Sequence, residues 1–320
     1  MQKILITGSN GLLGQKLVEL IAQKPNYQLI ATSRGENRLN LPNLNYEYHS
    51  LDITKKEDVE TVLSKFLPDI IIHTAAMTNV DECETNKEGC WAQNVVATED
   101  IANFCAKKGI FLLHLSTDFI FDGKSGPYNE SDTPNPISYY GESKFAAEKA
   151  LEDAFKDINT NLYAIARTVL VYGIAQDMSR SNIILWVKKS LEDRKNIKVV
   201  DDQWRTPTLA EDLAEGCFLI VSKKKAGIFN IAGKNLLTPY HMAMATADFF
   251  DLPTSYITRA DSSTFSQPAK RPPKTGFILD KAISTLEYQP HSFIEGLSIL
   301  KKQIAKQEIK QEVKQEIKEL

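Results

Sequence analysis

The chain has few cysteines and histidines and no long apolar run. Its 320 residues include four cysteines, none of them in a Cys-x-x-Cys pair, and five dispersed histidines. This pattern argues against a disulfide framework and offers no metal-ligand spacing, so we expect reduced thiols and no metal site. The first residues lack the apolar length of a signal peptide, and no run reaches the length of a membrane-spanning helix. We therefore expect a cytoplasmic protein with no membrane partner.

A strong excess of charge of either sign is also missing. The formal net charge is −3, which is too small to indicate a nucleic-acid-binding surface. Hydrophobic residues make up 42% of the chain, enough to bury a large core in one or two domains. These properties are typical of a globular enzyme that acts on small molecules.

A glycine-rich turn lies near the N-terminus. The apolar run 3–7 has the character of a β-strand, and leucines at helical spacing follow it. Glycines between a strand and a helix let the backbone approach a pyrophosphate at the helix N-terminus. The spacing departs from Gly-x-Gly-x-x-Gly, because Gly8 and Gly11 are three residues apart, and an ordinary turn remains the alternative. The turn residues that we assign to cofactor binding are Gly8, Asn10, Gly11, Leu12, Leu13 and Gly14.

The end of the next strand candidate, residues 27–34, indicates which dinucleotide binds. An acidic residue at this point would accept hydrogen bonds from a ribose hydroxyl, whereas an arginine would pair with a 2′-phosphate. The chain has Ser33 and Arg34 there. We therefore expect NADP(H) to be preferred, with NAD(H) still usable; a solvated loop arginine is the alternative.

Two further segments should lie along the cofactor. Asp52 and Ile53 follow a third strand-like stretch, where Asp52 would meet the adenine edge or, equally well, cap a helix that starts near Lys55. The run 68–76 is typical of a buried parallel strand, and it ends in small residues against which a flat cofactor can lie. From its end we assign three more residues to the cofactor: Thr74, Ala75 and Ala76.

The catalytic candidates are Thr117, Tyr140 and Lys144. Thr117 ends an apolar run, and hydroxyls at the carboxyl end of a parallel strand point into the ligand crevice. Tyr140 and Lys144 are four residues apart in a helical pattern and so share one face. An ammonium beside a phenol should lower the tyrosine pKa and prepare it to protonate the alkoxide formed by hydride addition.

Each of these residues has an expected task. Thr117 would polarise the carbonyl, while Lys144 would also hold the nicotinamide ribose, so that Tyr140 and Lys144 belong to the cofactor site as well. A tyrosine and a lysine at this spacing often only decorate a helix. The upstream glycine turn and the Ser-Thr strand end favour the catalytic interpretation.

These motifs resemble those of the extended short-chain dehydrogenases/reductases and, within that group, the dTDP-4-dehydrorhamnose reductase family. The stretch 116–123 is the most specific, because it separates this family from other sugar-nucleotide epimerases and dehydratases. The matching segments cover residues 1 to about 290: 7–14, 75–84, 94–98, 116–123, 140–144, 202–203 with 207–208, and 271–272.

The resemblance implies an NADPH-dependent reductase of a 4-keto sugar on a nucleoside diphosphate, with dTDP-4-dehydro-L-rhamnose reduced to dTDP-L-rhamnose as the first choice. It adds Asn94 to the cofactor contacts. Two positions depart from the family: Phe119 stands where tyrosine is common, and Leu170 where tryptophan is common. Both positions lie near the sugar in the family, so the exact sugar stays open. The expected substrate contacts are Thr78, Thr117, Phe119, Leu170, Arg205 and Arg271.

The domain organisation follows from the alternation of patterns. Strand and helix patterns alternate to about residue 172, which predicts an α/β fold with a doubly wound, Rossmann-like parallel sheet. Residues 173–300 should form a smaller, interleaved substrate-binding part, with a helix over 178–192, a strand over 197–200 and a loop over 260–274. Arg205 and Arg271 are its candidates for the nucleotide diphosphate, because guanidinium groups suit phosphate oxygens; each could equally be a plain surface arginine.

The C-terminal residues 301–320 are different in kind. From Lys306 they repeat a tetrad of lysine, glutamine, glutamate and an apolar residue. This pattern predicts a charged helical tail, either solvated, which we favour, or packed on a partner helix.

Three classes of function stay open. The first is the 4-keto sugar-nucleotide reductase. The second is an epimerase or dehydratase of the extended family, which recycles a retained NAD. The third is a non-catalytic dinucleotide-binding subunit that acts through a partner. The oligomeric state is not fixed by the sequence, and a homodimer is one option.

Overall fold

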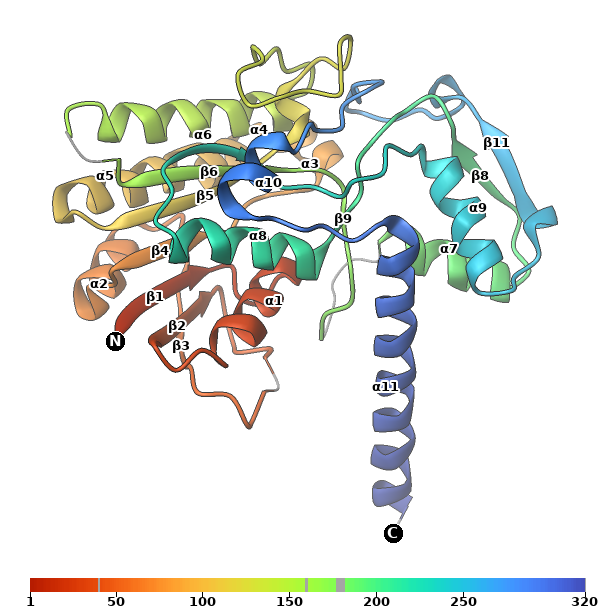
Figure 1. The fold of residues 1–320 in the computed structure, drawn as a ribbon, viewed down its shortest axis with the longest axis horizontal. Coiled ribbons are helices and arrows are strands. Elements are labelled where there is room, and N and C mark those ends of the chain that lie inside the picture. Colours follow the sequence, from red (N-terminus) through yellow and green to blue (C-terminus); the bar gives the residue numbers. More distant parts are fainter. Residues whose placement is uncertain (40, 159–160, 177–181, 320) are drawn as a thin grey trace.

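The computed structural model describes residues 1–39, 41–158, 161–176 and 182–319. A wholly parallel sheet forms its centre, with the strand order β10-β6-β5-β4-β1-β2-β3 (Figure 1). This order confirms the doubly wound α/β fold. Its strands are β1 (Gln2–Thr7), β2 (Tyr27–Ser33), β3 (Glu47–Ser50), β4 (Ile70–His73), β5 (Phe111–Thr117), β6 (Tyr163–Thr168) and β10 (Gly227–Asn230).

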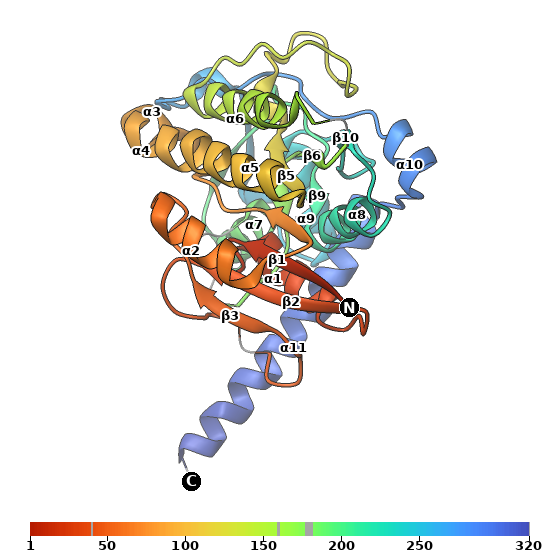
Figure 2. The same cartoon turned by 90° about the vertical axis from the view of Figure 1, so that its left-hand side faces the viewer.

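Helices cover both faces of the sheet, as Figure 2 shows. One face packs on α1 (Leu12–Ile21), α8 (Ala210–Ser222) and α10 (Asp280–Leu286), and the other on α2 (Lys56–Phe66), α5 (Ala97–Lys108) and α6 (Tyr139–Phe155). Alternate strand residues serve the two faces: Ile4 and Ile6 join the first core, and Leu5 joins the second. Both faces are therefore apolar, as expected of a buried parallel sheet.

A helical connection joins β4 to α5. It consists of α3 (Val80–Thr85), α4 (Lys87–Trp91) and a π-helical turn over Ala92–Val96 that runs directly into α5. Asparagines start the two short helices, since the side chains of Asn79 and Asn86 accept hydrogen bonds from backbone N–H groups of their first turns. A π-helical turn is rare and is often found at functional sites.

A smaller part lies beside the sheet on the right of Figure 1. In it β8 (Ile197–Val200) pairs with β11 (Ile257–Ala260), and β7 (Val171–Tyr172) pairs with β9 (Thr208–Leu209). The expected strand over 197–200 is thus β8. The helix expected over 178–192 begins at Ile183, and residues 178–181 lie outside the described part of the chain. The remaining helices are α7 (Ile183–Glu192), α9 (Pro239–Phe249) and α11 (Phe293–Glu319), with short 3-10 turns at 118–120, 254–256 and 262–264.

Three elements cross the expected boundaries. The strand β10 and helix α8 come after residue 172, yet they complete the central sheet and one of its helical layers. Helix α11 begins at Phe293, before the expected tail at 301, and its residues Leu297 and Leu300 are buried. In the described residues, no helix combines the length and apolar character that crossing a membrane requires.

Candidate active site

The glycine turn joins β1 to α1 and needs its glycines for space. Gly8 has a positive φ of 72°, and a Cβ atom there would lie 2.8 Å from the backbone nitrogen of Ala75. A Cβ on Gly14 would lie 2.2 Å from the carbonyl oxygen of Gly8. The turn, the helix and the loop after β4 are thus in close contact, as the sequence predicts.

The N-terminus of α1 is open to an anion. Its N-cap residue, Gly11, makes no side-chain cap, and the first turn holds no acidic residue. The first N–H groups of a helix have no partner within it, so they can face a phosphate. The Ser9 hydroxyl in the same turn is buried and has no hydrogen-bond partner among the described residues. These features fit a bound dinucleotide, with its pyrophosphate at Gly11–Leu13.

Thr7 connects this turn with the loop that follows β4. Its Oγ1 accepts hydrogen bonds from the backbone N–H groups of Thr74 (3.2 Å) and Ala75 (3.3 Å). Thr74 Oγ1 in turn donates to the Thr7 carbonyl at 2.6 Å. Thr74, Ala75 and Ala76 are all partly exposed at this edge, where the sequence places the cofactor.

Asn10, which we expect to contact the cofactor, also has partners within the protein. Its amide oxygen accepts from the Arg38 backbone N–H at 3.0 Å, and its amide nitrogen donates to the Glu36 carbonyl at 2.8 Å. Asn10 therefore ties the glycine turn to the loop after β2. The exposed side chains of Arg34 and Arg38 both lie in that region. Arg38 was not among the predicted residues, although a second arginine four positions after the first was a visible signal.

Asp52 lies at the end of β3 and forms a local turn. Its carboxylate accepts hydrogen bonds from the backbone N–H of Thr54 (3.1 Å) and from its hydroxyl (2.7 Å). Partial burial raises its pKa, but these bonds and the nearby Arg34 and Lys55 hold the pKa below its usual range. The alternative that Asp52 caps α2 is wrong, because Lys55 is the N-cap residue and its side chain makes no cap. Ile53 is buried in the core on the α2 side.

Asn94 is buried in the π-helical turn, and its amide is used inside the protein. Its Oδ1 accepts from the Met77 backbone N–H at 2.8 Å, and its Nδ2 donates to the Met77 carbonyl at 3.1 Å and to Ser143 Oγ at 3.0 Å. Asn94 thus joins the loop after β4 to α6. The Asn94 side chain supports two segments that border the candidate site, and its expected contact with the cofactor stays a prediction.

The structure brings Thr117 and Tyr140 together. Thr117 ends β5, and Ser138 caps α6 by accepting from the Gly141 N–H, which fixes the helix start beside Tyr140. Tyr140 is buried, with its ring edge-on to Phe119 at 5.8 Å between centroids. Burial raises the pKa of Tyr140 above its ordinary value, and a hydrogen bond with Thr117 opposes this only in part.

Lys144 does not lower the tyrosine pKa as we expected. Its ammonium lies 3.1 Å from Nε2 of His114, on β5, rather than against the phenol. Burial lowers the pKa of Lys144 to about 8, while Glu148 and Cys90 act in the opposite direction. The expectation failed because it counted the charge on the lysine and left out the burial of both groups.

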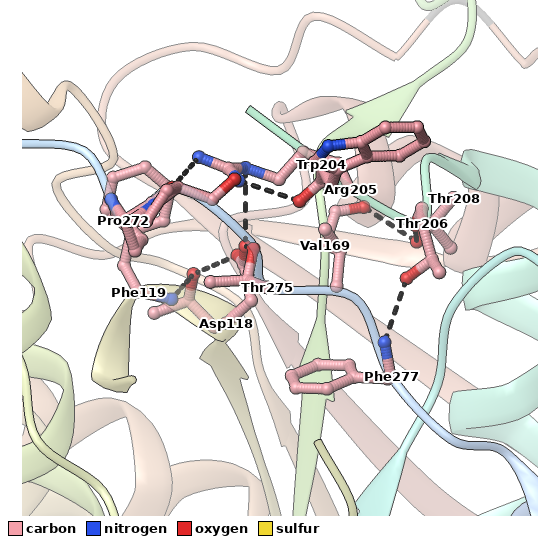
Figure 3. Close-up of polar contacts among 12 residues, drawn as sticks. Asp118, Phe119, Val169, Trp204, Arg205, Thr206, Thr208, Pro272, Thr275 and Phe277 are labelled. Carbon is pink, nitrogen blue, oxygen red and sulfur yellow. Dashed lines mark hydrogen bonds and ion pairs between the residues drawn. The ribbon is translucent and has the colours of Figure 1, made fainter. Parts of the chain in front are cut away.

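A buried polar cluster surrounds Asp118, which follows Thr117 (Figure 3). Thr117 Oγ1 donates to Asp118 Oδ1 at 3.1 Å, and Thr275 Oγ1 donates to Oδ2. The Arg205 guanidinium lies 3.7 Å from the same Oδ2. Burial raises the pKa of Asp118, and Arg205 opposes this. The cluster holds the Thr117 hydroxyl in one orientation. Asp118 was visible in the sequence directly after Thr117, but we gave it no role.

Arg205 is not the exposed diphosphate ligand that we expected. Its side chain is 6% exposed, and its guanidinium donates to the carbonyls of Trp204 and Pro272, both at 2.7 Å (Figure 3). The guanidinium also lies 5.7 Å from the ring centre of Phe119. Arg205 thus packs behind an expected substrate residue and ties residues 204–205 to the chain near 272.

The other expected substrate residues are more exposed. Arg271 makes a bidentate ion pair with Asp81, at 2.7 and 3.1 Å. Leu170 is 40% exposed and has a positive φ of 35°, which is uncommon for a leucine. Thr78 is exposed after β4. Arg271 also borders a cavity of about 260 Å³, whose other lining residues are Ile183, Trp186, Lys198, Val199, Val200, Gln203, Pro239, Phe265 and Gln267.

Comparisons with known proteins are consistent with this geometry. A family model described as RmlD substrate binding domain matches residues 1–305. A methionine adenosyltransferase 2 subunit beta of Xenopus tropicalis is 31% identical over 80% of this chain and 74% of its own. A dTDP-4-keto-6-deoxy-D-glucose reductase of Streptomyces niveus is 34% identical over 76% of each chain. The crystal structure of a Bacillus anthracis dTDP-4-dehydrorhamnose reductase in complex with NADP is 26% identical, covers 94% of this chain and 99% of its own, and has a TM-score of 0.78.

Proposed function

The chain belongs to the RmlD substrate binding domain family, and from this premise we propose that it reduces the 4-keto group of a nucleoside-diphosphate sugar with NADPH. It is an NAD(P)-dependent oxidoreductase whose catalytic residues are Thr117, Tyr140 and Lys144. The observation that carries the proposal is the buried phenol of Tyr140 at the Thr117 hydroxyl, at the carboxyl end of β5 in the central sheet.

The tasks of these side chains follow from their surroundings. NADPH, when bound, supplies the hydride. Tyr140 keeps its proton near neutral pH because burial raises its pKa, so it can protonate the oxygen of the reduced carbonyl. Thr117 lies at the phenol and donates its single hydroxyl proton to Asp118 in this structure, so it polarises a bound carbonyl by turning that proton from Asp118 to the substrate oxygen. Lys144 holds the nicotinamide ribose from the same face of α6.

NADP(H) is the preferred cofactor, and NAD(H) remains usable. The exposed Arg34 and Arg38 both follow β2, where they can pair with a 2′-phosphate. The Bacillus anthracis relative was crystallised with NADP. The glycine turn and the open N-terminus of α1 suit the pyrophosphate that both cofactors share.

For the substrate, dTDP-4-dehydro-L-rhamnose is the first choice. Two similar proteins carry the names of dTDP-4-keto or dTDP-4-dehydro sugar reductases. The cavity beside Arg271 and Trp186 offers an indole for a base, and the Arg271 guanidinium serves phosphate oxygens there by exchanging its ion pair with Asp81 for one with the diphosphate. Phe119 lacks the tyrosine hydroxyl that is common in the family, and Leu170 lacks the indole. These two changes are where a preference for another sugar would arise.

The test is a turnover assay with purified protein, NADPH and a panel of 4-keto nucleotide sugars. We expect loss of NADPH absorbance on addition of the rhamnose precursor or of a close relative. A second arm should supply NAD-loaded protein with nucleotide sugars that lack the keto group. Turnover there without use of NADPH would indicate an epimerase or dehydratase and overturn the proposal.

The similarity to a methionine adenosyltransferase subunit favours one alternative, a non-catalytic subunit. Such a protein would bind NADPH but would not oxidise it when any of the 4-keto sugars is added. It would change the activity of a methionine adenosyltransferase when the two proteins are mixed. The retained Thr117, Tyr140 and Lys144 argue for the reductase, because a binding subunit needs no proton donor. The homodimer and the cytoplasmic location remain predictions.

A further inference from the structure

A row of polar side chains crosses the sheet behind the catalytic helix. In the strand register, Thr7 on β1 pairs with His73 on β4, and His73 pairs with His114 on β5. Neighbours in register in a parallel sheet point to the same face. Since Leu5, Ile71 and Leu112, two residues earlier on each strand, join the core under α5 and α6, the polar row faces these helices.

The hydrogen bonds of His73 account for both of its ring nitrogens. Thr98 on α5 donates its hydroxyl proton to the Asn94 carbonyl at 2.7 Å, so it can only accept from His73 Nε2, which lies 3.2 Å away. His73 Nδ1 therefore accepts from the Thr7 hydroxyl at 2.7 Å. With the pKa of His73 lowered to about 3 by burial and by Lys144, the ring is neutral in this arrangement. His73 is thus explained by the support it gives to the glycine turn.

His114 is different, because only one of its nitrogens has a partner. Its Nε2 lies 3.1 Å from the amine of Lys144, while its Nδ1 is buried and has no hydrogen-bond partner among the described residues. Burial, Lys144 and His73 keep the pKa of His114 well below its ordinary value, so the ring is neutral. An ammonium can only donate, so Nε2 must accept and Nδ1 must carry the proton.

Packing alone does not explain a histidine here. A buried N–H without a partner destabilises the fold. The neighbouring positions of β5 are filled by leucines, Leu112 on the same face of the sheet and Leu113 and Leu115 on the opposite face. An aliphatic residue would satisfy the same space without an unpaired group. Among the described residues, the hydrogen bond that His114 makes through its side chain is the one with Lys144.

We propose that His114 is a positioning residue for the reductase reaction: its neutral Nε2 accepts a hydrogen bond from Lys144, stabilises the charged amine, and holds it toward the cofactor one helical turn from Tyr140. The inference rests on the function proposed above. Other groups face the same amine: Glu148 from its own helix, Cys90 from α4 and His73 from β4. The neutral acceptor at hydrogen-bond distance from the amine is His114, on β5.

The direction of the expected pH shift depends on which protonation state of Lys144 His114 stabilises. Accepting from the ammonium raises the pKa of Lys144 relative to a site without the acceptor, against the burial that lowers it to about 8. If the charged amine is required, activity is present below this pKa and is lost as the pH rises through it. Removal of the acceptor should therefore move the alkaline limb of the pH profile to lower pH.

Two amide substitutions of His114 test whether the acceptor must stand at the position of Nε2 or whether any polar side chain is sufficient. His114→Gln places an amide at the position of Nε2, where its oxygen can accept from Lys144, whereas His114→Asn places it at the position of Nδ1, out of reach. We expect His114→Asn to lower the alkaline limb of kcat/KM by about 1 to 2 pH units, and His114→Gln to remain close to wild type. Alkaline limbs that coincide in all three proteins would overturn the proposal.

Two further measurements need no sugar substrate. The pH dependence of the NADPH dissociation constant should show the same order among the three proteins. In wild-type protein, nitrogen-15 NMR should find His114 protonated at Nδ1 and not at Nε2, and a proton on Nε2 would also overturn the proposal. If these results hold while no 4-keto sugar is reduced, the proposed function fails and the link between His114 and Lys144 stands. The NMR arm stays decisive if either variant does not fold.

Discussion

Tyr140 is a phenol that the protein keeps protonated. Burial at 8% exposure raises its pKa, so the proton is present when a carbonyl accepts a hydride. Tyr140→Phe removes this proton and leaves the ring in its edge-on contact with Phe119. We expect turnover to fall by roughly 10²- to 10⁴-fold, with an unchanged dissociation constant for NADPH, measured by steady-state kinetics and calorimetry.

The neighbouring tyrosine provides the matched control. Tyr139 packs against Trp91, with 6.3 Å between ring centroids, and its hydroxyl has no part in the proposed mechanism. Tyr139→Phe should retain near wild-type turnover. Equal turnover in the two variants would show that water or another group supplies the proton.

In the proposed cofactor site, Arg34 and Arg38 supply two positive charges at the ribose end. Both are exposed and belong to the loop that Asn10 holds against the glycine turn. Arg34→Asp should reverse the preference for NADPH over NADH, because a carboxylate repels the 2′-phosphate and accepts from a ribose hydroxyl. Arg38→Ala should weaken NADPH binding and leave NADH binding unchanged. Calorimetric titration with both cofactors checks this, and equal affinities in the wild type would exclude the arginine explanation.

For single residues, the sequence shows which side chains lie near each other along the chain. It does not show which hydrogen-bond donors are occupied by partners elsewhere in the folded protein. Thr117 lies at a strand end and Tyr140 at a helix start, as the sequence predicts, because local patterns define both positions. The choice of Arg205 as a diphosphate ligand did not anticipate its burial, because its partner, the carbonyl of Pro272, is 67 residues away. The amide of Asn94 is likewise used by Met77 and Ser143, contacts that exist only in the folded chain.

Among the elements, β1, the glycine turn and α1 form a unit that local sequence describes well. Strand propensity, glycine geometry and leucine spacing all agree there. The position of β10 was not predictable, because Gly227–Asn230 is a short strand that reaches the sheet only by pairing with β6. The pairing of β11 with β8 likewise depends on residues about 60 positions apart.

The close approach within the first unit gives a prediction for Gly14. A methyl group there would lie 2.2 Å from the Gly8 carbonyl oxygen and 2.6 Å from Ser9 Cα, both backbone atoms. Gly14→Ala should therefore open the turn, cost about 1 to 3 kcal/mol of unfolding free energy and weaken NADPH binding. Gly11→Ala is the milder comparison, since its nearest neighbour is the Gly8 oxygen at 3.2 Å. Thermal unfolding and calorimetry measure both, and a larger loss in Gly11→Ala would contradict this account of the turn.

For the whole molecule, two buried or partly buried arginines tie the smaller part to the sheet. Arg205 connects residues 204–205, Pro272 and Asp118, at the end of β5. Arg271 connects the chain near 270 to Asp81, at the start of α3. Both ties reach segments next to the catalytic residues. The arrangement of the smaller part and the geometry around Thr117 are therefore coupled, which a boundary drawn at residue 172 does not express.

The C-terminal helix tests where the folded body ends. Leu297 and Leu300 are buried in the core of the smaller part, Ile304 packs against it, and the Gln303 side chain donates to Glu211 at 2.6 Å. A chain that ends after Glu308 keeps all of these contacts, so its melting temperature and NADPH affinity should match those of the full chain. A chain that ends after Lys302 loses Gln303 and Ile304, and its melting temperature should fall by about 2 to 5 °C, while NADPH affinity stays the same.

Light scattering on the same three chains separates a solvated extension from an assembly element. If the residues after Glu308 form a charged helix without a partner, the mass per particle is the same in the full chain and in the chain that ends at Glu308. A halved mass in the shorter chain would show that this segment joins two copies, as the four-residue repeat of apolar positions also allows. If the chain that ends at Glu308 matches the full chain in melting temperature and mass, while the chain that ends at Lys302 melts earlier, the residues needed for the fold end between Ile304 and Glu308.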